Sequence, residues 1–448
     1  MGLRAEPVVE IVGAGLAGCE AAWQLARRGI AVRLYEMRPL HPSPAHASGD
    51  LAELVCSNSL RSAQLTNAVG LLKEEMRRLG SLVMRAADAC AVPAGRALAV
   101  DRHAFARHVT DAIESHPLIE LRRELVSSIP DAPHVILASG PLTAPALARE
   151  LQALCGEEHL YFYDAIAPIV YADSVDPEVA FRASRWEEGE GDYWNLPLDR
   201  AAYEAFVDAL LAADTVPLHP CEQALYFEGC LPIEEMARRG RDTLAHGPMK
   251  PVGLVDPRTG RRPWAVVQLR QEDKQGVLYN LVGFQTRMRI PDQQRVFRSL
   301  PGLGGAVFAR YGSVHRNTYL NAPRQLAPDL ALRARPSVRV AGQMSGVEGY
   351  VESAAVGGLA GLFAAAAVRG EPPLLPPDTT AHGALLRHLR EADPRHFQPM
   401  NVNWGLFPPL ASGPDTRREK RAERNARLAE RALADLAPWL AAVGAQPA

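Results

Sequence analysis

At 448 residues the chain exceeds the length at which a single hydrophobic core keeps growing, so two domains, or one domain carrying an insertion, are expected. Its 47% hydrophobic and 22% charged residues are ordinary for a soluble globular chain, and a formal net charge of -2 excludes a global attraction to nucleic acid or membrane. The six cysteines lack metal-ligand spacing and disulfide-scaffold density, which predicts no metal site and favours a reducing cytoplasm.

The first predicted unit is a strand, a glycine-rich turn with a helix, and a second strand. Residues 8–12 (VVEIV) form a short apolar run, residues 13–29 (GAGLAGCEAAWQLARRG) follow, and residues 31–37 (AVRLYEM) read as the next strand. Gly13, Gly15 and Gly18 make the GxGxxG pattern in this context. Such glycines permit the turn, let the backbone approach a pyrophosphate and allow close packing of helix on strand.

The whole turn, from Gly13 to Gly18, is therefore predicted to bind a dinucleotide through Gly13, Ala14, Gly15, Leu16, Ala17 and Gly18. Glu36 closes the second strand eighteen residues after Gly18, where a carboxylate can accept hydrogen bonds from ribose hydroxyls. The motif does not separate FAD from NAD. A late strand that ends in glycine, at 337–346, suits a second contact to a long cofactor and favours FAD.

Two further apolar runs, 134–140 and 337–346, are predicted to be strands of the same sheet. Between them, residues 171–325 are richer in aromatic and charged residues, and alternating stretches at 264–270 and 277–284 predict antiparallel strands. The predicted fold is α/β: a Rossmann-like FAD-binding domain (residues 1–170 and 326–448) with an inserted α+β domain (171–325). Residues 353–368 are expected to be a buried helix rather than a membrane span, and 415–443 a docked terminal helix.

Two cysteines lie in segments that suit the edge of a pocket. Cys56 occurs in LAELVCSNSLRS and Cys230 in LYFEGCLPIEEMARRG. By composition alone neither segment is diagnostic, because a lone cysteine is more often a small buried side chain than a nucleophile.

These segments carry a resemblance that runs in order from about residue 8 to about residue 425. The chain resembles the methylenetetrahydrofolate-tRNA-(uracil-5-)-methyltransferases, the folate- and FAD-dependent kind. The resemblance rests on VVEIVGAGLAGCEAAWQLARRGIAVRLYEMRP, LVCSNSLRS, HGPMKPVGLVDPRTGRRPWAVVQLRQEDK, HRNTYLNAP, GVEGYVESAAVGGLAG and FQPMNVNWGLFPP.

The resemblance implies formation of 5-methyluridine in the T-loop of tRNA. The carbon would come from 5,10-methylenetetrahydrofolate, the reducing equivalents from reduced FAD, and NAD(P)H would recharge the flavin. The partners implied are the tRNA T-arm, folate and NAD(P)H, in the cytoplasm and without a membrane. The family's two functional cysteines match Cys56 and Cys230, and its flavin turn matches residues 13–18.

The chemistry requires an ionised thiol, because adding a thiolate to carbon 6 of uracil makes carbon 5 nucleophilic. The hypothesis is that Cys230 is this nucleophile, while Cys56 lies beside the flavin and helps to hold or release the methylene carbon. The reverse assignment stays open. Arg238 and Arg239 are near Cys230 in sequence, and Glu228 is a proton carrier by proximity alone, with a surface glutamate the favoured reading.

Contacts to RNA are expected from local arginine clusters, although any cluster could equally be a solvated face. The candidate clusters are Arg238, Arg239 and Arg241; Arg261 and Arg262; Arg287, Arg289, Arg295 and Arg298; and the terminal helix from Arg417 to Arg431. Tyr350 is a weak candidate for stacking near flavin or folate, and His315, Arg316 and Asn317 form a polar stretch that could meet folate or RNA.

Three other functions are compatible with some of these sequence features. A flavin oxidoreductase acting on a small molecule would use the same turn but gives no reason for the two cysteine segments. A non-catalytic RNA-binding flavoprotein would bind RNA without forming a product. The related flavoproteins that modify wobble uridines carry a longer helical C-terminal region than this chain.

Overall fold

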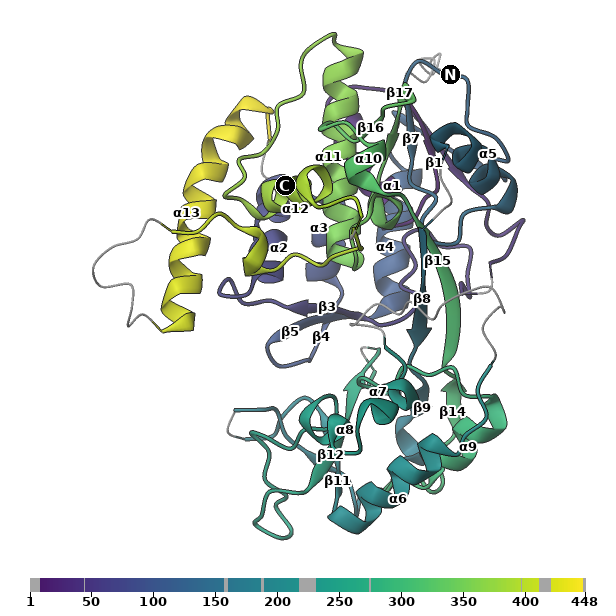
Figure 1. The fold of residues 1–448 in the computed structure, drawn as a ribbon, viewed down its shortest axis with the longest axis vertical. Coiled ribbons are helices and arrows are strands. Elements are labelled where there is room, and N and C mark those ends of the chain that lie inside the picture. The colour runs from purple at the N-terminus through teal and green to yellow at the C-terminus, as the bar shows by residue number, and fades with distance from the viewer. Residues whose placement is uncertain are drawn as a thin grey trace.

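The computed structural model describes residues 9–43, 45–156, 160–186, 189–216, 231–273, 275–395, 397–410 and 420–445, with the backbone alone in 160–166 and 313–318. The chain forms a larger body, at the top of Figure 1, and a smaller body below it. The larger body contains both the early and the late parts of the chain, and the smaller body contains the middle part. The middle of the chain is therefore inserted into the larger body.

A six-stranded sheet forms the centre of the larger body, in the order β16-β17-β7-β1-β2-β6. The strands from β17 to β6 are parallel, and only β16 runs antiparallel to its neighbour. This confirms that the runs near 134–140 and 337–346 belong to the same sheet as the N-terminal unit. The strands are β1 (Val9–Val12), β2 (Val32–Glu36), β6 (Ile119–Arg123), β7 (Val135–Leu137), β16 (Ala331–Leu332) and β17 (Arg335–Val340).

Two helices pack closely beside this sheet through small residues. Helix α1 (Leu16–Ala26) follows the glycine turn, and α11 (Tyr350–Val368) follows the late strand. A Cβ at Gly357 would lie 2.2 Å from the carbonyl oxygen of Ala17, so glycine is needed for this approach. Helix α11 is long and apolar enough to cross a membrane, but 78% of its most apolar window is buried inside the protein. It is thus a core helix, as the sequence predicted.

The rest of the larger body is helical, with one small sheet of order β3-β5-β4. Helix α13, which is yellow in Figure 1, begins at Arg421, and its apolar face is buried through Leu428, Ala432 and Leu436. The docked terminal helix is therefore confirmed from Arg421 onward. The other elements are β3 (Ser59–Ser62), β4 (Ala91–Val92), β5 (Ala97–Val100), α2 (Ala68–Arg78), α3 (Leu82–Ala89), α4 (Arg102–Glu114), α5 (Pro145–Cys155), α10 (Ala322–Gln325), α12 (Ala381–Glu391) and α13 (Arg421–Ala442).

The inserted body has its own antiparallel sheet, in the order β10-β11-β12-β13-β9-β14. Its core includes Phe206, Phe284 and Phe297, whose rings lie in successive contact with centroids 5.9 Å apart. The predicted antiparallel pair is confirmed as β12 and β13. The elements are β9 (Ile169–Tyr171), β10 (Phe181–Arg182), β11 (Trp194–Leu198), β12 (Ala265–Gln271), β13 (Leu278–Leu281), β14 (Phe308–Arg310), α6 (Arg200–Leu211), α7 (Ile233–Arg239), α8 (Thr243–His246) and α9 (Ile290–Arg298).

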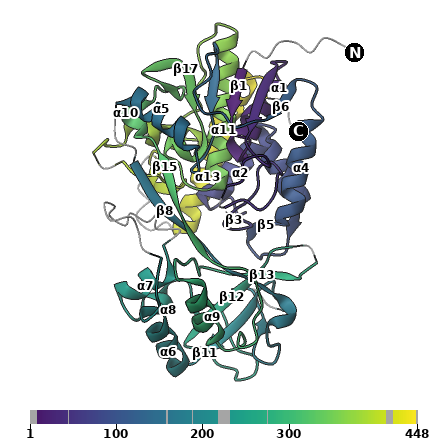
Figure 2. The ribbon, with the colours of Figure 1, turned by 90° about the vertical axis from the view of Figure 1, so that its right-hand side faces the viewer.

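A two-stranded antiparallel ribbon, β8 (Leu160–Ile166) with β15 (Ser313–Tyr319), carries the chain between the two bodies. Figure 2 shows this ribbon descending from the larger body to the inserted one. The second core contains residues between Val170 and Ala306, whereas Tyr319 and Leu320 already belong to the first core. The boundaries at 171 and 325 stay predictions about where each folding unit ends.

Candidate active site

A cavity of about 530 Å³ lies where the two bodies meet, a volume typical of ligand-binding clefts. Its walls include several parts of the chain that are distant in sequence. Among them are the glycine turn with the end of β2, the Cys56 segment, the loop after β7, strands β12 and β13 of the inserted sheet, and the start of α11. The inserted sheet thus faces the dinucleotide turn across one shared space.

Glycine has a different structural role at each of the three positions in the turn. Gly13 has a φ of +100°, and a Cβ there would lie 2.5 Å from the carbonyl oxygen of Ala138. A Cβ on Gly18 would lie 1.8 Å from the carbonyl oxygen of Gly13. Around Gly15 there is nothing within 4 Å of the Cβ position, and Gly15 lines the cavity. Gly13 and Gly18 are therefore required for folding, whereas Gly15 leaves space for a ligand.

The N-terminus of α1 is directed to this space and has no side-chain cap at Gly15. The first N–H groups of a helix have no partner within the helix and, with the helix dipole, favour an anion. An open glycine at an uncapped helix start fits the diphosphate of a dinucleotide. The residues present thus fit FAD, with the turn from Gly13 to Gly18 as the holder of its diphosphate.

Glu36 lies at the end of β2 and is 6% exposed. Its carboxylate accepts hydrogen bonds from the backbone N–H of Ala14, at 3.2 Å, and from Nε of Arg38, at 2.9 Å. Burial alone would raise the pKa of Glu36, but the hydrogen bonds and charge of Arg38 outweigh it and hold the pKa below its usual value. Glu36 is therefore an anion that lines the cavity, as an acceptor of ribose hydroxyls must be.

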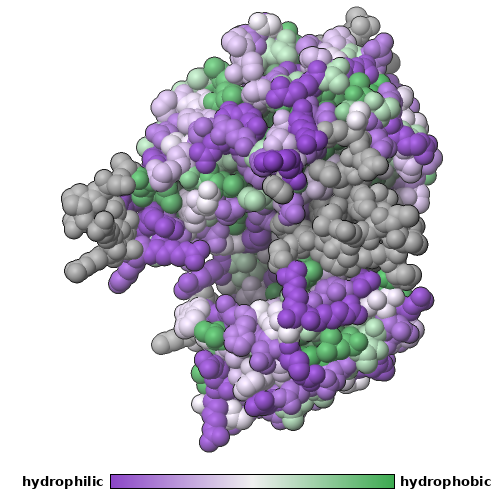
Figure 3. Space-filling view, viewed as in Figure 1, coloured by the Kyte–Doolittle hydropathy of each residue, from purple (hydrophilic) through white to green (hydrophobic). Residues whose placement is uncertain are grey.

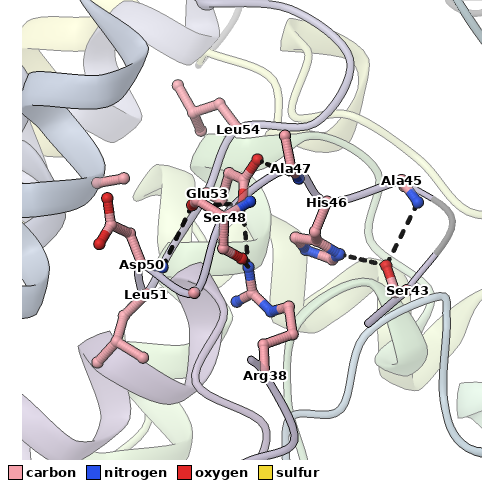
Figure 4. Close-up of polar contacts among 12 residues, drawn as sticks. Arg38, Ser43, Ala45, His46, Ala47, Ser48, Asp50, Leu51, Glu53 and Leu54 are labelled. Carbon is pink, nitrogen blue, oxygen red and sulfur yellow. Dashed lines mark hydrogen bonds and ion pairs between the residues drawn. The ribbon is translucent and has the colours of Figure 1, made fainter. Parts of the chain in front are cut away.

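The buried Arg38 connects Glu36 to a second carboxylate, Glu53, at 3.1 Å. Figure 4 shows Glu53 among the backbone N–H groups of Ala47 and Ser48, which donate to it, with His46 beyond them. This network fixes the loop after β2 against the end of that strand. His46 and Glu53 also line the cavity, so the loop forms its wall on the Glu36 side.

Cys56 also lines the cavity and lies beside Tyr350 at the start of α11. Its Sγ is 2.8 Å from the Tyr350 hydroxyl, which also accepts hydrogen bonds from the backbone N–H groups of Cys56, at 2.7 Å, and Ser57, at 3.3 Å. Because two N–H groups already donate to this oxygen, its single proton is free to be donated to sulfur. Burial and the neighbouring Cys56 raise the pKa of Tyr350 well above its usual value, so the phenol keeps that proton.

Two buried arginines surround the same segment. Arg310 donates to the carbonyl oxygens of Val55, at 2.8 Å, and Cys56, at 3.1 Å, and Arg102 donates to that of Leu54 at 3.1 Å. Burial and the charge of Arg102 lower the pKa of Arg310 to about 10, so it remains a cation at neutral pH. Burial would lower the pKa of Arg102, but Glu272 raises it above its usual value. Arg310 and the phenol donor can stabilise an anion at Cys56, whereas the charge of Arg102 is balanced by the buried Glu272.

The Tyr350 hydrogen bond can be tested separately from the arginines. In Tyr350→Phe the donor to sulfur is lost, and we expect alkylation of Cys56 by iodoacetamide at neutral pH to slow about fivefold, the effect of a hydrogen bond worth about 1 kcal/mol. Peptide mass spectrometry measures the rate at Cys56. Tyr311→Phe, in which the lost hydroxyl lies outside the cavity lining, is the control. An unchanged rate in Tyr350→Phe would mean that the phenol does not donate to the sulfur.

Several predicted residues lie elsewhere. Cys230 and Glu228 are outside the described residues, and the side chains of His315, Arg316 and Asn317 are not described. Arg238 is in an ion pair with Glu235 at 2.6 Å. Cys19, on helix α1 after the turn, is a fully buried core residue. No sequence pattern pointed to Arg102 and Arg310, because neither lies near Cys56 along the chain.

The fold and the cavity together define an FAD-type dinucleotide-binding flavoprotein with an inserted second domain. The model of the GIDA family, "Glucose inhibited division protein A", matches residues 8–372. The chain is similar to two proteins named methylenetetrahydrofolate--tRNA-(uracil-5-)-methyltransferase TrmFO, from Desulforudis audaxviator and Geobacter sulfurreducens. Each is 60% identical over 436 residues, which is 97% of this chain and 99% of the relative.

The chain belongs to the GIDA family and, within it, to the TrmFO group of methylenetetrahydrofolate–tRNA-(uracil-5-)-methyltransferases. Among solved structures it is similar to Aquifex aeolicus GidA in the form II crystal, with a TM-score of 0.68 and 16% identity over 98% of this chain and 74% of that one. At that identity the likeness concerns the fold, and it agrees with the Rossmann-like domain carrying an insertion.

Proposed function

We propose that this chain is a folate- and FAD-dependent methyltransferase that converts a uridine of tRNA to 5-methyluridine. The observation that carries the proposal is identity of about 60%, over nearly the whole length, to relatives named for this activity. The cavity supports it, because a dinucleotide turn and a cysteine flanked by cations line one space. The finer proposals are that the uridine lies in the T-loop, that NAD(P)H is the reductant and that the reaction takes place in the cytoplasm.

The chain's own residues would divide the work as follows. The turn from Gly13 to Gly18 and Glu36 hold FAD, which when bound supplies the reducing equivalents of the reaction. Tyr350 and Arg310 would stabilise an anion at Cys56 on the cavity wall. A thiolate that adds to carbon 6 of uracil makes carbon 5 nucleophilic toward the carbon of methylenetetrahydrofolate, and we assign this addition to Cys230.

The direct test is incubation of the purified protein with unmodified tRNA, carbon-labelled methylenetetrahydrofolate and NAD(P)H, followed by nucleoside analysis of the RNA. Labelled 5-methyluridine is the expected product. If the flavin is reduced by NAD(P)H but the RNA stays unlabelled, the result supports the alternative of a flavin oxidoreductase acting on a small molecule. Tight binding of tRNA with neither outcome would instead favour a non-catalytic RNA-binding flavoprotein.

The structure separates the arginine clusters that were candidates for RNA contact. Arg241, Arg287 and Arg295 are in ion pairs with nearby carboxylates, so part of their charge is neutralised. Arg261 and Arg262 are exposed on the loop before β12 and have no ion pair with any residue in the described part of the chain. An isolated antiparallel β-bridge between the backbones of Asp256 and Arg261 holds this loop in shape.

The molecule also offers room for RNA near the junction of its two bodies. Figure 3 shows a notch between the larger and the inserted body, opening below α13, and the visible rim is mostly hydrophilic. Exposed guanidinium groups and a polar notch suit phosphates, which supply most of the non-specific affinity for nucleic acid. We therefore propose Arg261 and Arg262 as phosphate contacts.

The double variant Arg261→Ala, Arg262→Ala should bind tRNA more weakly at every salt concentration while keeping its flavin. If each arginine meets one phosphate, the slope of log K against log salt should become shallower by about 2. Filter binding across a salt series measures the slope. Arg395→Ala, which removes an exposed arginine paired with Asp393, is the matched control and should leave the slope unchanged. An unaltered slope in the double variant would exclude these two contacts.

A further inference from the structure

The inserted sheet contributes to the cavity one side chain whose amide nitrogen has no partner in the described part of the chain. Asn280, on β13, is 3% exposed and lines the cavity. Its side-chain nitrogen is buried and has no hydrogen-bond partner among the described residues. A buried amide is ordinarily satisfied, so an unsatisfied one at a cavity wall indicates a missing ligand.

The neighbours of Asn280 explain why no protein group satisfies it. Arg270 is directly opposite on β12, and its guanidinium is bonded to Asn58 Oδ1, at 3.0 Å, and to Ser57 Oγ, at 2.7 Å. On the other side Asn280 pairs with Ile169, which is apolar. Arg270 is a donor only and cannot accept from the Asn280 nitrogen, and its own N–H groups are directed to the segment that follows Cys56.

The same contacts place Asn280 close to the reactive thiol. Residues directly opposite in an antiparallel pair have Cβ atoms about 5 Å apart. Arg270 therefore links Asn280 to Ser57, the residue next to Cys56, in a short chain of contacts. In Figure 2, β13 lies at the upper edge of the inserted body, below β3 and β5 of the larger one.

The chemistry of this wall selects the kind of ligand. A carboxamide offers a donor and an acceptor side by side, which complements a ring N–H next to a ring carbonyl. Ala167 and Val282 line the same cavity and supply apolar surface for the faces of a ring. The side chain has no charge, so it gives no preference for a phosphate or a carboxylate.

We propose that Asn280 is the centre of a subsite that binds the lactam edge of a heterocycle and positions that ring at Cys56. The proposal rests on the proposed function, whose two reactants each carry such an edge: the target uracil and the pterin of methylenetetrahydrofolate. Asn280 is a specificity-determining residue that contacts one of these rings through paired hydrogen bonds. On this proposal the flavin does not need Asn280, because its diphosphate meets the glycine turn, which is a different part of the cavity lining.

The test uses Asn280→Asp, which keeps the shape but loses the donor, and Asn280→Leu, which removes both hydrogen bonds at similar volume. Asn425→Asp is the matched control, because Asn425 is also buried with an unbonded amide oxygen but lies outside the cavity lining. For each flavin-loaded protein, flavin content, melting temperature, the Kd for tetrahydrofolate and the release of tritium from carbon-5-labelled tRNA without folate are measured.

We expect both Asn280 variants to keep flavin and to lose roughly 100-fold in one ligand's readout, the scale of losing two hydrogen bonds to one ring. A loss confined to the Kd for tetrahydrofolate assigns the pterin, and a loss confined to tritium release assigns the uracil. Unchanged values in both readouts, or a loss of flavin, would overturn the proposal. The Kd for tetrahydrofolate needs no methyl transfer, so it remains informative if the wild-type protein forms no 5-methyluridine.

Discussion

Gly15→Val is expected to give a folded protein that contains no flavin and forms no 5-methyluridine. The backbone at Gly15 has a φ of -75°, which any residue adopts, and nothing lies within 4 Å of its Cβ position. A valine side chain therefore meets no protein atom there. It would instead occupy the space in front of α1 that a diphosphate needs, as the role of the middle glycine in this turn requires.

The measurements for this variant are the flavin absorbance and the melting temperature. The melting temperature should equal that of flavin-free wild-type protein, because bound ligand adds stability of its own. Gly304→Val is the control, since that Cβ position also has nothing within 4 Å and Gly304 is outside the cavity lining. Gly18→Val should fail to fold, because its Cβ would overlap the Gly13 carbonyl. A yellow Gly15→Val protein would show that the diphosphate does not lie at this turn.

The second large effect concerns Cys230→Ala and Cys56→Ala. Both variants should lose methyl transfer, but only one of them should lose the earlier exchange of the hydrogen at carbon 5. Methyl transfer should fall on the order of 10⁴-fold or more in each, the scale seen when a covalent nucleophile is removed. Thiolate addition to carbon 6 by itself lets carbon 5 exchange its hydrogen with water. Cys230→Ala should therefore also stop the release of tritium from carbon-5-labelled uridine in tRNA, while Cys56→Ala should still release it.

Both proteins should remain folded and yellow. Cys155→Ala, in which a partly exposed thiol outside the cavity lining is removed, should keep full activity. The opposite pattern of tritium release would establish the reverse assignment, with Cys56 as the nucleophile. Normal methyl transfer in Cys230→Ala would remove Cys230 from the mechanism, and loss of flavin in Cys56→Ala would assign that residue a structural role instead.

The sequence by itself determined the elements whose evidence is local. The strand, glycine turn, helix and acidic strand end from Val9 to Glu36 lie within 28 residues, and each needs particular residue types that the pattern exposes. The apolar helix α11 and the antiparallel pair β12–β13 were predictable for the same reason. The limits of the inserted domain and the roles of the two cysteines remain predictions, and Cys230 lies outside the described residues.

The tertiary structure alone decided which side chains surround Cys56. Tyr350 is 294 residues away along the chain, and Arg310 is 254 residues away, yet both make hydrogen bonds to Cys56. Asn280 reaches the same cavity from another domain. No periodicity or spacing encodes such contacts, because they arise from the packing of the inserted sheet and α11 against the larger body. The sequence therefore determined the cofactor turn, whereas folding brought the reactive thiol, its cations and the unsatisfied amide into one site.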